Sequence, residues 1–251
     1  MAEMKSKNPA LSAKVLEQFG QTGRAYAGEA MTVEGTINKS ALLLLLLVIP
    51  ATWVWSQVAH GDVEAVMPWM WGGIVGGFIT ALVTIFKKEW APVTAPIYAA
   101  LEGLAIGGLS AVLEAQYHGI VLQAVGLTFG VMLCMLVAYR TGLIKVTDRF
   151  RTVVVAATGA IALMYLVTLG LAFFGVTVPF IHQTGTVAIV VSLVIVAVAA
   201  LNLALDFDFI EQAAGVGAPK YVEWYAAFGL MVTMIWLYLE ILRLLSKLRR
   251  R

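Results

Sequence analysis

Residues 185–212 read GTVAIVVSLVIVAVAALNLALDFDFIEQ, an uncharged apolar run that ends in two aspartates and a glutamate. A helix needs about 20 apolar residues to cross roughly 30 Å of hydrocarbon, so residues 185–205 predict a transmembrane helix. Asp206, Asp208 and Glu211 follow where this helix leaves the hydrocarbon. They are either a solvated helix end or the working part of an ion pathway.

The whole chain shares this apolar character. Its 251 residues are 61% hydrophobic and only 13% charged, whereas soluble proteins carry about 25% charged residues. The predicted fold class is therefore all-α: a polytopic membrane protein with a bundle of seven transmembrane helices. Six further apolar runs supply the other spans, at 41–58, 66–86, 94–115, 120–139, 152–174 and 221–245.

Three segments follow from this pattern: a leader at 1–40 with a short helix at 10–19, a seven-helix domain at 41–245, and a basic tail at 246–251. Lys and Arg mark cytoplasmic loops. They are present in the leader and in the loops after the second and fourth spans, and absent from the alternate loops. This predicts a cytoplasmic N-terminus. Strict alternation then places the basic tail outside, so the seventh segment either spans against its charge preference or re-enters the membrane.

Small residues recur four positions apart, a spacing that lets helix backbones approach closely. We expect packing contacts at each of these pairs: Gly72 and Gly76, Gly73 and Gly77, Gly103 and Gly107, Gly126 and Gly130.

A charge inside a span costs free energy and needs a reason. Glu102 lies well inside the third span, and residues 90–139 contain no Lys or Arg to pair with it. It predicts a proton- or cation-binding carboxylate that faces the bundle interior. The alternative is a protonated glutamate that bonds a neighbouring helix.

Helical spacing separates the carboxylates of the sixth span. Asn202 and Asp206 are four apart and share a helix face, whereas Asp206 and Asp208 point to opposite sides. Asp206 is predicted to face the bundle near the cytoplasmic mouth, with Asp208 and Glu211 on the surface. Asp206 and Glu102 would line one route if their helices are adjacent. Their oxygens suit Ca²⁺, so both are candidate ligands.

Five segments together resemble the Bax inhibitor-1 family, also described as YccA-like or transmembrane BAX-inhibitor-motif proteins, in its bacterial branch. They are MTVEGTINKSALLLLLL (31–47), APIYAALEGLAIGGLSAVLE (95–114), VLQAVGLTFGVMLCML (121–136), LNLALDFDFIEQ (201–212) and APKYVEWYAAFGLMVTMIWLYLEILRLL (218–245).

The resemblance implies seven helices around a central last helix, a pH-sensitive Ca²⁺ leak, and contacts with other membrane proteins, including a membrane protease in bacteria. It also implies a pH sensor made of two aspartates, one at the end of the sixth helix and one in the seventh. Asp206 matches the first, and Thr233 stands where the second belongs. A slipped alignment would offer Glu240, which lies too far along the helix. Glu102 matches the family's glutamate.

These observations predict a Ca²⁺ or cation leak channel in the bacterial inner membrane, with Glu102 and Asp206 on the path or gate. No nucleophile–base motif is present, so no enzyme is predicted; no cofactor is expected beyond Ca²⁺ as permeant or bound ion, and the net charge of +2 indicates no nucleic-acid partner. The alternative is a non-conducting regulator that binds a membrane protease or another membrane complex in the lipid bilayer. The supporting site residues are Asn202, Asp208, Glu211 and Thr233.

Overall fold

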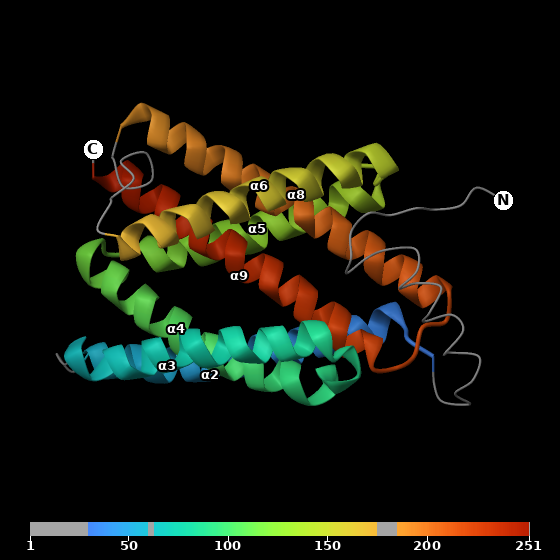
Figure 1. Cartoon of the computed structure of the whole chain (residues 1–251), viewed down its shortest axis with the longest axis horizontal. Helices are drawn as coiled ribbons and strands as arrows, with labels where there is room; N and C mark the ends of the chain where they lie inside the picture. The colour runs from blue at the N-terminus through green and yellow to red at the C-terminus, as the bar shows by residue number, and fades with distance from the viewer. Residues whose placement is uncertain (1–29, 60–62, 175–184, 251) are drawn as a thin grey trace. The chain divides into compact units, whose positions relative to one another are not determined.

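The computed structural model describes residues 30–59, 63–174 and 185–250, and over these residues the chain is helical (Figure 1). The helix predicted at 10–19 lies outside the described residues. Seven helices are long and apolar enough to cross a membrane, as the sequence predicts. They are α2 (Val33–Ala59), α3 (Val63–Phe86), α4 (Ala91–Gln116), α5 (Ile120–Arg140), α6 (Asp148–Phe173), α8 (Thr186–Gly215) and α9 (Val222–Arg249), with a short 3₁₀ turn, η1 (Lys88–Trp90), before α4.

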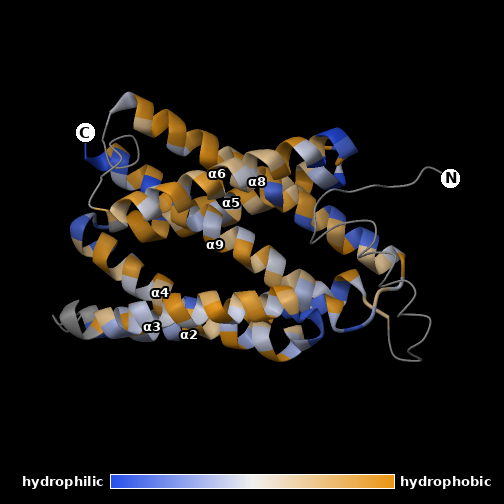
Figure 2. Ribbon diagram, in the orientation of Figure 1, coloured by the Kyte–Doolittle hydropathy of each residue, from blue (hydrophilic) through white to orange (hydrophobic). Residues whose placement is uncertain are grey.

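The distribution of apolar residues suits hydrocarbon rather than water. Hydropathy colouring shows apolar residues along the helices and hydrophilic residues gathered at helix ends (Figure 2). Large apolar side chains are exposed along the middle of several helices, among them Phe78, Leu133, Leu166 and Leu193. In water such a surface would drive aggregation, so these faces are the ones that meet lipid.

The described helices form two compact units. Unit 1 contains α2, α3, η1 and α4 together with Asp208–Val232, and unit 2 contains α5 and α6 together with Thr233–Arg251 and the part of α8 up to Phe207. Helices α8 and α9 therefore contribute residues to both units. Each unit is described below by itself.

Small residues bring the backbones of unit 1 close together. A Cβ atom added at Gly103 of α4 would lie 2.2 Å from the carbonyl oxygen of Leu47 in α2, and one at Gly107 would lie 2.5 Å from that of Ala51. Nothing larger than glycine fits these positions without a backbone shift. The predicted packing role holds here.

The same expectation is wrong at three other glycines. Cβ atoms added at Gly72, Gly126 and Gly130 would meet nothing within 4 Å among the described residues. Spacing alone permits a close approach, but it does not supply the second helix.

Two helices, α2 and α8, extend furthest beyond their apolar runs. Helix α2 begins at Val33, eight residues before the run at 41, and Thr32 caps it by accepting a hydrogen bond from the Gly35 N–H at 2.9 Å. Helix α8 continues to Gly215. Helix α9 is continuous from Val222 to Arg249, so the seventh segment is one unbroken helix rather than a re-entrant pair.

Candidate functional site

The structure brings Asp206 of α8 and Thr233 of α9 together within unit 2. The Thr233 hydroxyl hydrogen-bonds the Asp206 carboxyl group. Thr233 is buried, and the Asp206 Oδ2 atom is buried without a hydrogen-bond partner among the described residues. One side of this carboxyl group is thus held by a neutral hydroxyl, and the other is available to a proton or a cation.

One turn earlier on α8, the Asn202 side chain makes structural hydrogen bonds and is not a second cation-binding group. Its Nδ2 donates to Thr158 Oγ1 of α6 at 2.8 Å and to the Val198 carbonyl oxygen at 2.8 Å. Both amide hydrogens are therefore engaged. Asn202 ties α8 to α6 and so sets the position of the Asp206 backbone.

Asp208 and Glu211 belong to unit 1 and have a different environment. Asp208 Oδ2 accepts a hydrogen bond from Gln212 Nε2 at 2.6 Å, one helical turn away. Glu211 is exposed. These contacts resemble a solvated helix end more than a binding site.

Glu102 is half-buried in unit 1, where its carboxyl group hydrogen-bonds the Tyr98 side chain of the same helix. It lies against α3 at Gly77, where an added Cβ would be 3.5 Å from the Glu102 Cδ and Oε1 atoms. The Glu102 carboxyl group is thus in ordinary van der Waals range of α3. Glu102 and Asp206 lie in different units, and the shared route remains a prediction.

A second intramembrane carboxylate, Glu240 of α9, lies in unit 2. Its Oε1 accepts from the Tyr165 hydroxyl of α6 at 2.6 Å and from Arg243 Nη1 at 2.8 Å. The residue is buried, and its Oε2 atom has no partner in the described part of the chain. The sequence shows Glu240 and Arg243 as polar interruptions of the last span, but it gives no sign of Tyr165, 75 residues away.

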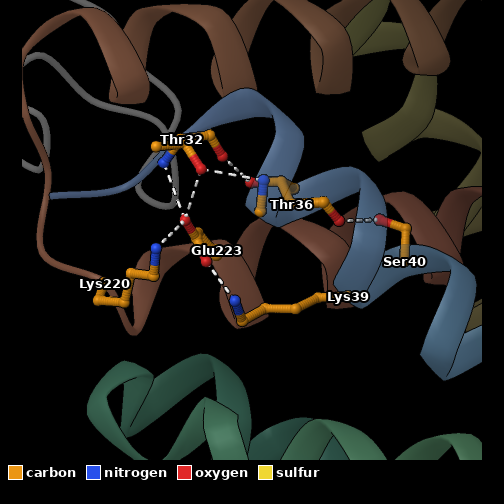
Figure 3. Close-up of polar contacts among 7 residues, drawn as sticks. Thr32, Thr36, Lys39, Ser40, Lys220 and Glu223 are labelled. Carbon is orange, nitrogen blue, oxygen red and sulfur yellow. Dashed lines mark hydrogen bonds and ion pairs between the residues drawn. The ribbon is translucent and has the colours of Figure 1, made fainter. Parts of the chain in front are cut away.

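A third buried carboxylate, Glu223, begins α9 in unit 1 (Figure 3). It accepts from the Thr32 N–H at 2.9 Å, from the Thr32 hydroxyl at 3.1 Å, and from both Lys220 and Lys39. A carboxylate at a helix N-terminus also gains from the helix dipole. The cluster binds the first turn of α2 to the first turn of α9, and sequence reasoning missed it.

The candidate Ca²⁺ ligands do not form a closed metal centre. No group of three or more His, Cys, Asp or Glu side chains converges among the described residues. Tight Ca²⁺ sites use six to eight oxygen ligands. A single carboxylate supplies at most two of these oxygens.

Searches among curated proteins and among solved structures return no significant match. A family model described as Bax inhibitor 1 like matches residues 8–250, nearly the whole chain. With seven membrane-length helices and this match, the chain belongs to the Bax inhibitor 1 like family.

Proposed function

We propose that the protein is a cation leak, with Ca²⁺ as permeant ion, in the bacterial inner membrane, and that Asp206 lies at its gate. One observation carries the proposal: the Asp206 Oδ2 atom is buried within unit 2 and lacks a hydrogen-bond partner among the described residues. An ionised carboxylate in such a place needs a cation or water to offset its desolvation. Membership of the Bax inhibitor 1 like family supports the same reading.

Thr233 changes how such a gate responds to pH. Two carboxyl groups in contact share a proton at low pH and repel each other once both ionise. A threonine hydroxyl carries no charge, so Asp206 has no such repulsion from Thr233. The natural protein should therefore lose flux only as Asp206 itself becomes protonated, without the additional opening that repulsion between two carboxylates would supply.

Calcium flux into dye-loaded proteoliposomes tests the role of Asp206. Asp206→Asn should lower the flux by about tenfold, since each 1.4 kcal/mol added to the barrier costs about a factor of ten in rate. Asp148→Asn is the matched control, because Asp148 is exposed in the first turn of α6. Unchanged flux in Asp206→Asn would remove Asp206 from the gate, and Glu102→Gln then tests the path in unit 1 separately.

Thr233→Asp tests the pH argument. It should produce a flux that rises between about pH 6 and about pH 8, as the shared proton is lost and repulsion opens the gate. Wild type and Thr233→Ser, which keeps the hydroxyl, should show only the shallower rise that comes from ionisation of Asp206 itself. A profile for Thr233→Asp that coincides with that of the wild type would contradict the gate at this contact.

Folded wild type that passes no Ca²⁺ would contradict the leak and favour the regulator. In that case, affinity capture of a membrane protease by the full chain, and its loss when residues 1–29 are deleted, would be the next measurement.

A further inference from the structure

From Thr233 onward, polar residues of α9 repeat every seven positions. Thr233, Glu240 and Lys247 are all buried. Seven residues make nearly two helical turns, so the three share one face of α9 and are spaced about 10 Å apart along it. Buried polar groups need hydrogen-bond partners. A helix face that carries several of them therefore packs against another helix that supplies these partners.

That partner within unit 2 is α8. Thr233 hydrogen-bonds Asp206, and Lys247 Nζ donates to Ser192 Oγ at 2.8 Å and to the Ala188 carbonyl oxygen at 3.3 Å. Ser192 and Asp206 lie fourteen residues apart on α8, just as Thr233 and Lys247 do on α9. The two helices therefore run antiparallel along a polar seam. Glu240 lies midway between Thr233 and Lys247 on the same face of α9, and its hydroxyl partner there is Tyr165 of α6.

Two carboxyl oxygens on this seam share one property. Asp206 Oδ2 and Glu240 Oε2 are the buried side-chain oxygens or nitrogens that lack a hydrogen-bond partner among the described residues. An unpartnered buried oxygen is costly to the fold. Finding both of them between α8 and α9 of unit 2 indicates a common use rather than two separate packing faults.

The Arg243 guanidinium beside Glu240 donates to both Glu240 Oε1 and the Tyr165 hydroxyl, yet its side chain remains partly open to water. The Arg243 side chain is 39% exposed while that of Glu240 is 2% exposed, and the guanidinium lies over the Tyr165 ring at 5.1 Å. A long arginine can withdraw its head toward water while its stem stays on apolar surface. The short glutamate cannot follow it. Arg243 is therefore a tethered counter-ion that can leave, and the carboxylate stays.

We propose that Glu240 is a second cation-binding carboxylate on the α8–α9 seam, and that an entering divalent cation displaces Arg243 from it. This rests on the proposed function, because it supplies a binding step next to the one at Asp206. Tyr165 positions the carboxylate through its hydroxyl. Conduction needs sites that bind a cation weakly and release it to a neighbour, and two partly satisfied carboxyl groups, one on α8 and one on α9 of unit 2, meet that need.

Two substitutions with opposite expected signs test the proposal in the full chain. Glu240→Gln should lower Ca²⁺ flux in proteoliposomes by about fivefold, because the binding step is lost, whereas Arg243→Gln should raise it by about twofold, because the competitor is lost. The double variant should behave like Glu240→Gln. Glu34→Gln and Arg149→Gln, at two exposed positions, make the same charge changes as controls and should leave the flux unchanged.

A second readout separates this proposal from the leak itself. Tb³⁺ replaces Ca²⁺ at oxygen ligands, and its luminescence is sensitised by nearby aromatic rings such as Tyr165. Binding should weaken in Glu240→Gln and strengthen in Arg243→Gln, with each variant shown to be folded by size exclusion. Flux or binding that shifts in the same direction in both variants, or in neither, would overturn the proposal while a conducting wild type leaves the leak intact. Binding that depends on Glu240 in a wild type that does not conduct would support the site and overturn the leak.

Discussion

Helix α9 carries two buried glutamates, and their surroundings differ. Glu223 in unit 1 receives two backbone or hydroxyl donors from Thr32 and two lysine ammonium groups. Glu240 in unit 2 receives two donors, both on Oε1, and its Oε2 has no partner in the described part of the chain. The two residues have the same chemistry and equal burial, and they differ in how completely their oxygens are satisfied.

The number of hydrogen-bond donors on the two oxygens distinguishes a carboxylate that stabilises the fold from one that can bind a ligand. A buried charge with all its lone pairs engaged holds elements together and has nothing left for a ligand. A buried carboxylate with an open oxygen is costly to the fold, and it is kept where it binds something. Asp206, with its open Oδ2, belongs with Glu240 in this comparison.

The largest expected effect on stability is at Glu223. Glu223→Gln removes the charge that both lysines contact, and it should lower the free energy of unfolding by about 2–3 kcal/mol, the range for charge-assisted hydrogen bonds. SDS titration of the protein in mixed micelles measures it. Ca²⁺ flux per folded molecule should not change.

Glu34→Gln is the control, since Glu34 is exposed in the first turn of α2. Ordinary surface substitutions cost less than about 0.5 kcal/mol. A loss that small in Glu223→Gln would mean that a full set of hydrogen-bond donors on a buried carboxylate does not indicate a structural role.

The next largest effect on stability is expected for Gly35→Ala, which tests whether the Glu223 carboxylate can move. A Cβ added at Gly35 would lie 2.3 Å from Glu223 Oε1. A mobile side chain would move aside at little cost, whereas one held by four donors cannot. We expect Gly35→Ala to cost about 1–2 kcal/mol by overpacking.

Gly126→Ala is the comparison, because nothing described lies within 4 Å of that position and the helix gains propensity there. Combining Gly35→Ala with Glu223→Gln should cost less than the sum of the two, since both act on the same contact. Additive losses in this cycle would show that Gly35 and Glu223 act independently.

The smallest effect on stability is expected at Glu240. Glu240→Gln removes one partner of an ion pair whose other partner, Arg243, is 39% exposed, so no unpaired charge is left buried. The free energy of unfolding should change by less than about 1 kcal/mol, because the partner Arg243 can turn to water. A loss as large as that of Glu223→Gln would place both glutamates in the same structural class and remove the contrast.

The seven spans were predictable because hydropathy acts locally. Each span meets lipid over much of its surface, so its own residues report its environment. The position of Asp206 on the inner face also followed from spacing within one helix. Its contact with Thr233 agrees with the register taken from the family resemblance, rather than with the slipped one at Glu240.

The buried glutamates were not predictable for the converse reason. Thr32 and Glu223 are 191 residues apart, and Tyr165 and Glu240 are 75 apart. Nothing in the local pattern joins them. The sequence places the polar first turns of α2 in the leader, because hydropathy detects only apolar residues. It does not detect that the start of this helix is stabilised by hydrogen bonds to Glu223. The glycine pairs show the same limit, since Gly103 meets α2 and Gly126 meets no described atom.

The length of α8 has a consequence for the membrane itself. The helix has 30 residues, Thr186–Gly215, and at 1.5 Å per residue it is about 45 Å long against about 30 Å of hydrocarbon. Asp206 lies about 30 Å along it, at the edge of the hydrocarbon if the helix enters at Thr186. A thicker bilayer would draw this carboxyl group inward and a thinner one would expose it.

We therefore expect Ca²⁺ flux to be higher in proteoliposomes of short-chain phosphatidylcholine than in those of long-chain phosphatidylcholine, and Asp206→Asn to remove most of the difference. Equal flux in both lipids would show that hydrophobic mismatch does not reach Asp206. A flux that falls with acyl-chain length would mean that bilayer thickness acts on the protein as an effector does, without occupying a site.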